Sequence, residues 1–567
     1  MSDFSVVNLV DDRLVNKSIQ IPLIRGAQSI AKQTISCVGG NPNTTNINYV
    51  LSISTPNIAV DRRFLHHVKA EFSVPVTNVS TDTAIPIGDL TGTAWLCVQN
   101  FSLADYPISN LFSTVSAGVN DKQVCSYDFR QLKNLLLRLG NIRKNMGETP
   151  CPSQVELTYA RYADAYLTRS NPMAGYADSD FGMYTPNGSW TYTVSNNGAA
   201  IAFGTAGNLT VTVESYEPLL IPPFIAEADL DSDMGGLFYV RNITVNMAIG
   251  DANRVFRFNP AGAAGGAGVV PVRITGNATL SNINTAELKY KTLTTPLYDG
   301  YRLPTPVSNV HLFDVAPTQK YGVAFTPATS VGGQTISLIQ FRASGLPKYV
   351  ILACRKDVTT YAISEANWYF PITNVSINTP AQQSVLGQFD QRDLFECTRR
   401  CGLQQDYLSY SGSANSLGYT NPGTLQNATV PTCSGPVILE FGKDIAMPLG
   451  FVPGSAGSFD FDFYVTCKNQ FAAAQNGVDN TAAIPILTAV YVYDTYLEIN
   501  ASNLQADLKR SILSWNDVAG VKTISAPISD VVDSGSGLMQ KMHQMGEGHE
   551  SNIGHKGQHG ALKRVKH

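Results

Sequence analysis

The chain has 567 residues, which at about 150 residues per domain predicts three to four domains, or two large all-β domains. Charged residues make up 15% of the sequence, below the roughly 25% of an average soluble protein, and hydrophobic residues make up 44%. This composition excludes an intrinsically disordered chain and a coiled coil. Forty basic and 44 acidic side chains leave a net charge of −4, so any binding of nucleic acid or anionic membrane is expected to be local.

The start of the sequence and its cysteines predict a protein that is made in a cell and is not secreted. The first thirty residues contain no basic start followed by a long apolar run, so no signal peptide is expected. No segment reaches the roughly 20 apolar residues of a membrane-spanning helix. The 9 cysteines are odd in number and scattered, which indicates reduced thiols. Without secretion, sequons such as the one at Asn187 are expected to carry no glycan.

Alternation of apolar and polar residues predicts a protein built mainly of β-strands. From Phe64 to Val76 apolar side chains alternate with polar ones that include His67, Lys69 and Glu71. One face of this strand is therefore expected to be buried and the other wet, because successive side chains of a strand point to opposite faces. The stretch from Leu237 to Ile249 repeats the pattern.

Later strand segments predict that the β domain is duplicated. Residues 190–194 and 209–213 are expected to form a closing antiparallel pair in the first half, and residues 458–468 and 484–499 are their expected counterparts in the second. Between the copies, residues 215–236 contain three prolines, an acidic run and a glycine pair, which would stop a strand and redirect the chain. The domain boundary is predicted there.

Loops and a few helices complete the expected organisation. Ser126 is expected to cap a helix with an apolar stripe over residues 129–139, ended by Gly140. A second apolar stripe, from Leu504 to Trp515, predicts a helix that either packs on its own domain or docks on a neighbouring subunit. Three long segments rich in Gly, Asn, Ser and Pro are expected to be surface loops: 170–189, 259–268 and 411–436.

Residue patterns that carry chemistry are absent or incomplete. There is no phosphate-binding glycine motif, nucleophile elbow or metalloprotease signature. His66 and His67 are adjacent on a strand, so they are expected to point to opposite faces and not to share a metal. Cys397 and Cys401 could supply two zinc ligands, but no second pair has a matching spacing. We therefore predict no enzymatic activity, no cofactor and no metal site.

An acidic group near the predicted boundary resembles a calcium site only in its abundance of oxygens. It lacks the glycine turn and the closing glutamate of an EF-hand loop, so a solvated linker is the preferred interpretation. The group consists of Glu227, Asp229, Asp231 and Asp233.

Residues 541–567 differ from the rest of the chain. Five of the 8 histidines lie there with five Lys or Arg and two Glu residues, a net charge of +3 that rises as the pH falls through about 6.5. Such a segment cannot bury a core, so it is either a solvated tail or a basic arm that meets phosphate groups of a genome or of lipids. The candidate residues of this basic tail are Lys541, His543, His549, His555, Lys556, His559, Lys563, Arg564, Lys566 and His567.

Short motifs occur in a fixed order between roughly residues 45 and 500. They are Ala104–Ser109, Gly118–Asn120, Tyr216–Glu217, Leu220–Phe224, Leu346–Val350, Asn374–Ile377, Ser384–Leu386, Asp393–Phe395 and Leu439–Asp444. In this order and spacing the sequence resembles the double jelly-roll major capsid proteins of virophages and polinton-like viruses. It departs from them in its loops and after Asn503.

The resemblance implies an all-β chain of two tandem eight-stranded jelly rolls, with long loops and few short helices. The segments expected from it are an N-terminal arm (1–44), the first jelly roll (45–224), a linker (225–236), the second jelly roll (237–502) and a C-terminal arm with the basic tail (503–567).

The resemblance also implies a function as the major capsid protein in the virion of an icosahedral double-stranded DNA virus. Three chains would form a pseudo-hexameric capsomer. The implied partners are further copies of the chain, neighbouring capsomers, penton or minor capsid proteins, and genomic DNA or an internal membrane through the tail. The alternatives are a carbohydrate-binding β-sandwich protein and a minor capsid component.

Overall fold

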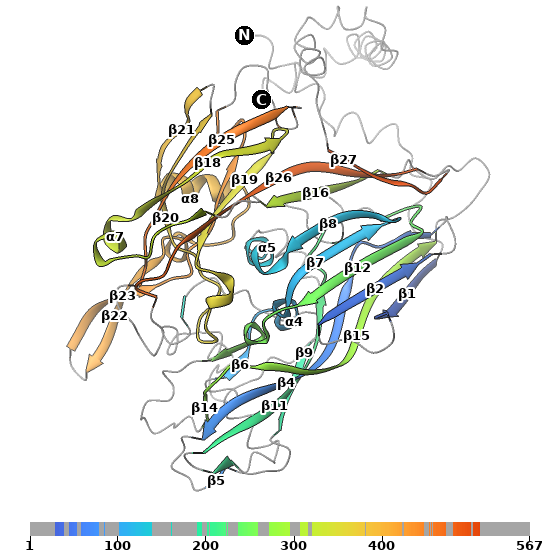
Figure 1. The fold of residues 1–567 in the computed structure, drawn as a ribbon, viewed down its shortest axis with the longest axis horizontal. Coiled ribbons are helices and arrows are strands. Elements are labelled where there is room, and N and C mark those ends of the chain that lie inside the picture. The colour runs from blue at the N-terminus through green and yellow to red at the C-terminus, as the bar shows by residue number, and fades with distance from the viewer. Residues whose placement is uncertain are drawn as a thin grey trace, which may run out of the picture. The chain divides into compact units, whose positions relative to one another are not determined.

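A computed structural model gives the fold of the chain (Figure 1). Nearly all described residues belong to one compact unit, formed by residues 26–447 and 457–511. A second unit comprises residues 1–25, 448–456 and 512–567, of which only residues 453 and 455 are described. The described residues are 29–38, 45–53, 58–78, 84–85, 101–138, 160–161, 190–195, 201–202, 205–222, 224, 236–258, 272–294, 307–315, 320–379, 382–421, 424–446, 453, 455, 457–471, 480–500 and 503–510.

Two antiparallel sheets form the first sandwich (Figure 1). The larger sheet has the order β1-β15-β4-β11-β9, with β3 and β14 paired to β15 and β4: β1 Ser29–Ser36, β15 Thr279–Thr294, β4 Leu65–Asn78, β11 Ala206–Pro218, β9 Trp190–Ser195, β3 Ile58–Val60 and β14 Val272–Ile274. The smaller sheet has the order β2-β12-β7-β8: β2 Asn46–Ser52, β12 Asn242–Ile249, β7 Phe112–Val119 and β8 Lys122–Asp128.

Two further antiparallel sheets form the second sandwich. The larger has the order β16-β26-β19-β24, with β17 and β27 paired to β26: β16 Val307–Val315, β26 Ile486–Ile499, β19 Tyr349–Arg355, β24 Val437–Glu440, β17 Lys320–Tyr321 and β27 Ala506–Arg510. The smaller has the order β18-β25-β20-β21: β18 Gln334–Ser344, β25 Ser458–Cys467, β20 Ile372–Thr379 and β21 Gln382–Asp390.

Short elements connect or decorate the sheets. Three two-stranded ribbons pair β5 with β10, β6 with β13 and β22 with β23: β5 Ala84–Ile85, β10 Ile201–Ala202, β6 Phe101–Leu103, β13 Phe256–Phe258, β22 Ser413–Asn421 and β23 Thr424–Pro431. The helices of the described part are α4 Pro107–Leu111, α5 Phe129–Leu136, α7 Pro327–Gly332, α8 Gln391–Arg400, α9 Tyr407–Tyr410 and the 3-10 turns η3 Ala252–Val255 and η5 Val358–Thr360. The expected all-β class with few short helices is confirmed.

The alternation of apolar residues places the cores. On β4, Val68, Ala70, Phe72 and Val74 are fully buried between the two sheets of the first sandwich. Each of the valine and phenylalanine side chains contributes about 1.5–3 kcal/mol by leaving water. In the second sandwich, Tyr491 of β26 lies with its ring centroid 6.1 Å from that of Phe461 and 6.3 Å from that of Phe463 on β25. Each pair of sheets therefore encloses its own aromatic and aliphatic layer.

The chain passes from one sandwich to the other later than the sequence predicts. β12 and β15 follow the predicted boundary at residues 225–236, yet β12 pairs with β2 and β7, and β15 pairs with β4. The crossing lies between β15 and β16, after Thr294. An amphipathic strand pattern shows which residues are buried but not which sandwich buries them, so the repeat at residues 237–249 was assigned to the wrong copy.

Both predicted arms contribute strands to the sheets. β1 lies inside the expected N-terminal arm and pairs with β15 along its whole length. β27 lies inside the expected C-terminal arm and pairs with β26. The helix predicted from Leu504 to Trp515 is therefore wrong for residues 506–510, because unpaired ladder groups on β26 recruit this stretch as an edge strand, and the remainder of that helix lies outside the described residues.

Three other local predictions change. The helix after residue 128 is confirmed, but it ends at Leu136 and begins after Asp128, because Ser126 belongs to β8. Residues 411–436, expected as a loop, contain the β22–β23 hairpin. The strands 458–467 and 486–499 both form but do not pair with each other, because β25 and β26 belong to facing sheets. The closing pair of the first half, β9 with β11, is confirmed.

Candidate functional site at the junction of the two sandwiches

In the large sheet of the second sandwich, strands β19, β24 and β26 are buried on both faces. On β19, Leu352 and Cys354 face the core of the second sandwich, whereas Ile351 and Ala353 join the apolar cluster that continues from the first sandwich. Val490 of β26 belongs to the same cluster. Because protein packs against both of its faces, β19 is a continuous apolar run in the sequence from Val350 to Cys354. The two sandwiches of the chain thus share one apolar boundary, which we call the junction.

Arg138 carries a buried positive charge from the first sandwich into the second. It follows α5 and is only 2% exposed. Its guanidinium donates to the side-chain oxygen of Gln405 at 2.9 Å, to the backbone carbonyl of Asn367 at 2.6 Å and to the carbonyl of Ser434, and it lies 4.5 Å from the ring centroid of Tyr369. These oxygens and the aromatic face replace the water that the guanidinium loses.

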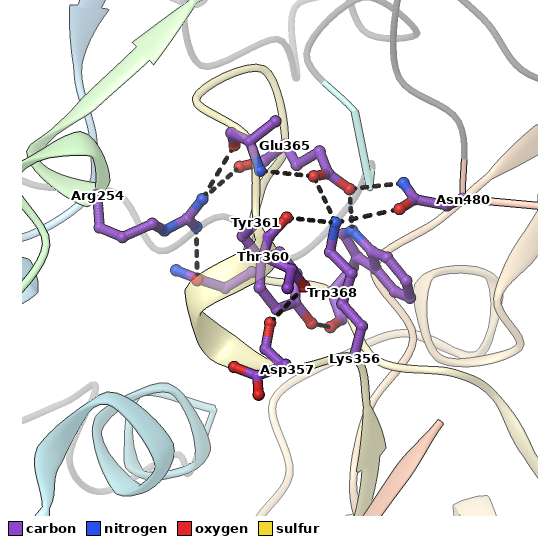
Figure 2. A network of polar contacts seen from close by, with 10 residues as sticks. Arg254, Lys356, Asp357, Thr360, Tyr361, Glu365, Trp368 and Asn480 are labelled. Carbon is purple, nitrogen blue, oxygen red and sulfur yellow. Dashed lines mark hydrogen bonds and ion pairs between the residues drawn. The ribbon is translucent and has the colours of Figure 1, made fainter. Parts of the chain in front are cut away.

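A second buried network is centred on Glu365 (Figure 2). The carboxylate is 1% exposed and accepts from Lys356 Nζ at 2.7 Å, Trp368 Nε1 at 3.0 Å and Asn480 Nδ2 at 2.6 Å. Burial lowers the pKa of Lys356, and the neighbouring carboxylate of Glu365 opposes this shift. Removing one partner would leave the other charge buried without compensation, which is strongly destabilising.

Most of this network lies in the loop formed by residues 356–370, which we call the junction loop. Arg254 connects the first sandwich to the junction loop. Arg254 of η3 donates to the carbonyls of Ala362 at 3.1 Å and Glu365 at 3.2 Å and to the side-chain oxygen of Asn367 at 2.7 Å (Figure 2). Arg138 and Arg254 therefore both reach from one sandwich onto the same loop of the other.

Two of the motifs that are distant in the sequence meet inside the first sandwich. Glu217 is fully buried and accepts from the backbone amides of Ile108 at 2.8 Å and Ser109 at 2.7 Å, at the start of α4. Ser215 also donates to it, at 2.9 Å. Burial raises the pKa of Glu217, and the hydrogen bonds from these amides oppose that rise. The carboxylate supplies partners for amides that have none within the helix.

Other motif residues also make hydrogen bonds in turns and at helix ends. Asn120 has a φ of 47° in the turn between β7 and β8, a conformation that Asn tolerates, and its side chain accepts from the amide of Arg241 at 2.6 Å and donates to the carbonyl of Leu504 at 2.8 Å. Asp444 accepts from the amide of Glu440 at 2.8 Å and pairs with Arg400 of α8. These motifs therefore mark turns and helix ends rather than reactive groups.

The adjacent histidines point to opposite faces of β4, as predicted. His66 is buried, and its Nε2 lies 2.8 Å from the hydroxyl of Tyr49. His67 lies on the outer face, with Nδ1 3.1 Å from Glu287 and Nε2 3.0 Å from Glu214. Burial lowers the pKa of His66 to about 3, with a smaller contribution from His67. The two side chains therefore share no ligand.

The remaining candidate sites divide into those the structure describes and those it does not. Burial and, next, Asp444 raise the pKa of Cys397 to about 12. Among the described residues, no three His, Cys, Asp or Glu side chains form a group that could hold a metal, and no helix is long and apolar enough to span a membrane. The acidic group from Glu227 to Asp233 and the ten residues of the basic tail, Lys541 to His567, lie outside the described residues.

Sequence reasoning missed the residues of the junction. The available signal is a cation that directly ends an apolar run, as Arg138 does after Leu135–Leu137 and as Arg355 and Lys356 do after Val350–Cys354. Such cations are rarely fully buried unless they are paired.

Two sandwiches of this kind in one chain define a protein of the double jelly-roll class, and comparisons with known proteins specify the family. Residues 2–291 match the model of the Sputnik virophage major capsid protein first domain, and residues 318–492 match the model of the major capsid protein V20 C-terminal domain. The two matches lie on either side of the observed crossing between the sandwiches.

Solved structures show the same fold. The cryo-EM structure of the Sputnik virophage at 3.5 Å resolution aligns with a TM-score of 0.69 at 18% identity, over 89% of this chain and 92% of that chain. The crystal structure of the mavirus major capsid protein aligns with a TM-score of 0.64 at 13% identity, over 88% of this chain and 95% of that chain. No curated protein sequence matches the chain.

The chain belongs to the virophage family of double jelly-roll major capsid proteins, since the first-domain model alone matches more than half of it. Its function is structural rather than enzymatic, as a component of the virion capsid.

Proposed function

We propose that three copies of the chain form a pseudo-hexameric capsomer, the repeating unit of an icosahedral shell. Each chain carries two sandwiches, so a threefold trimer presents six similar β domains around one axis and fills a hexagonal lattice position. The junction carries this proposal. Arg138 and Arg254 hold the two sandwiches of one chain together, so that neighbouring chains meet a preformed pair.

The proposal extends to the arms and the basic tail. The contacts between subunits come from the flanks of the sandwiches and from the arms at residues 1–44 and 503–567. The tail, residues 541–567, faces the inside of the shell, where its net charge of +3 favours phosphate of the genome or of an internal membrane. Neighbouring capsomers and penton or minor capsid proteins are the further partners.

Light scattering on the full chain and on a chain ending at residue 540 tests both parts. Three chains of 61.2 kDa give about 184 kDa, and we expect this mass for the full chain. The shortened chain should keep the trimer, while shells that assemble from it should contain less DNA. A full-length variant with Gln at the five Lys and Arg positions of the tail is the control that separates the loss of charge from the loss of length. A stable monomer of the full chain would contradict the trimer, and trimers lost on shortening would contradict the interior role of the tail.

A further inference from the structure

The network in Figure 2 brings an amine, a carboxamide and a carboxylate into mutual contact. Lys356 Nζ lies 3.0 Å from Asn480 Oδ1 and 2.7 Å from Glu365 Oε2, and Asn480 Nδ2 lies 2.6 Å from Glu365 Oε1. The carboxylate therefore contacts both the nitrogen that can attack the carboxamide and the nitrogen that would leave it. Lys356 directly follows β19, and Asn480 lies shortly before β26, 124 positions later in the chain.

The three groups lie in a site from which water is largely excluded. Lys356, Glu365 and Asn480 are 7%, 1% and 5% exposed. The rings of Tyr361 and Trp368 cover the amine, with ring centroids 4.7 and 5.6 Å from Nζ. Trp368 Nε1 also donates to Glu365 at 3.0 Å and holds the carboxylate in place. Low exposure protects the carboxamide from hydrolysis, so that the amine is the nucleophile closest to it.

Burial favours the neutral forms of the amine and of the carboxylic acid. Burial lowers the pKa of Lys356, Glu365 opposes this shift, and Arg254 adds a smaller decrease. As an ammonium, Lys356 donates to the carbonyl of Thr360 at 3.1 Å as well as to Glu365 and Asn480. Transfer of one proton from Nζ to Glu365 replaces two buried charges with two neutral groups. The neutral amine that results is a nucleophile.

We propose that Lys356 and Asn480 react to form an isopeptide bond, with Glu365 as the proton carrier. Nζ of the neutral amine attacks Cγ of Asn480. Glu365 then gives its proton to Nδ2 and takes one from Nζ, the Cγ–Nδ2 bond breaks, and ammonia leaves. The new amide joins Nζ to Cγ, and the remaining proton stays on Glu365. Atoms and charges balance without an oxidant or a cofactor. Each chain reacts once with itself, so the protein remains a structural component.

The isopeptide bond closes residues 356–480 into a covalent ring within the second sandwich. The ring contains β20, β21 and β25 of the smaller sheet and β24 of the larger sheet. A cross-link of this kind restricts the unfolded chain, so it opposes unfolding of the sandwich. Unlike a disulfide, an amide persists in the reducing interior of a cell.

Intact-mass spectrometry of the full chain, purified without denaturant and incubated at neutral pH, tests the proposal. We expect a mass lower than that of the sequence by one ammonia molecule, and digestion should give a branched peptide that joins Lys356 to Asn480. The branched peptide distinguishes this bond from a cyclic imide at an asparagine, which also loses ammonia. A folded chain of full mass, or one that loses water through a bond between Lys356 and Glu365, would overturn the proposal.

Variants assign the roles of the three groups. Asn480→Ala removes the attacked carbon and keeps the ion pair of Lys356 with Glu365, so it is expected to fold and to keep its full mass. Glu365→Gln cannot carry the proton, and its yield of branched peptide should fall at least tenfold. The control is Glu440→Gln, which removes a carboxylate 3.0 Å from Lys443 Nζ and should react as the wild type does. Loss of ammonia from folded Asn480→Ala, or a wild-type yield from Glu365→Gln, would contradict the proposed reaction.

Discussion

His66 and His67 show how side-chain surroundings set the charge of neighbouring residues. His66 is buried against Tyr49 and Phe112, and as a neutral ring it can accept a hydrogen bond from the hydroxyl of Tyr49 through Nε2. His67, one residue later, has a carboxylate at each ring nitrogen and stacks on Tyr216, with ring centroids 4.0 Å apart. The two histidines have different surroundings because successive side chains of a strand point to opposite faces of the sheet.

The buried histidine predicts a loss of stability in acid. The pKa of His66 is about 3 in the folded chain and about 6.5 unfolded, so between these values the unfolded state binds the extra proton. The stability conferred by His66 is therefore complete above pH 6.5 and is lost as the pH falls toward 3, by up to about 2 kcal/mol between pH 7 and pH 5. Urea unfolding of wild type and His66→Gln at pH 7, 6 and 5 measures it.

In that experiment the variant should be less stable than wild type at pH 7, and the gap should shrink as the pH falls. His66→Gln keeps an acceptor for Tyr49 but has no titratable ring. A gap that stays constant from pH 7 to pH 5 would show that His66 does not carry this pH dependence.

At the scale of elements, α4 depends on a carboxylate from a strand. Glu217 of β11 accepts from two amides of this five-residue helix, which is too short to form alone. In Glu217→Gln an amide nitrogen would face one of these N–H donors, so we expect a loss of about 1–3 kcal/mol in unfolding free energy by urea titration. Glu214→Gln, on the same strand but partly exposed, is the matched control and should cost less than about 1 kcal/mol. Equal losses in the two variants would contradict this role of Glu217.

The same elements show what sequence could and could not predict. Alternation on β4 and the apolar stripe of α5 gave the right structure, because burial on one face leaves a period of two or of three to four residues in the sequence. The choice of which strands pair with each other leaves no such period in the sequence. The pattern over 237–249 correctly indicated a strand, but its place between β2 and β7 depends on residues more than 100 positions earlier in the chain.

The junction was harder to predict than either sandwich. The motifs Tyr216–Glu217 and Ala104–Ser109 were both singled out in the sequence, yet their contact in space was not deduced. Arg138 and Glu365 belong to none of the motifs found in the sequence. A single buried charge leaves no periodic pattern that sequence analysis could detect. Low charge content favoured a structural protein, and the motif order indicated the family, but neither located the surface that joins the two sandwiches.

At the scale of the whole molecule, the junction makes the two sandwiches depend on each other. One face of the β16-β26-β19-β24 sheet is covered by the first sandwich, and separating the sandwiches would expose Ile351 and Val490 to water. It would also break the hydrogen bonds from Arg138 to Gln405 and Asn367, which cross the junction.

This dependence predicts that the full chain unfolds in one calorimetric transition. Arg138→Met removes the hydrogen bonds to the side chain of Gln405 and to the carbonyl of Asn367, which should cost about 2–4 kcal/mol at the junction and separate the transition into two. Phe463→Leu, in the core of the second sandwich, is the control: it should lower the midpoint and keep one transition. Scanning calorimetry at one protein concentration distinguishes these results. Two transitions in the wild-type chain would mean that the sandwiches unfold independently and that the junction does not couple them.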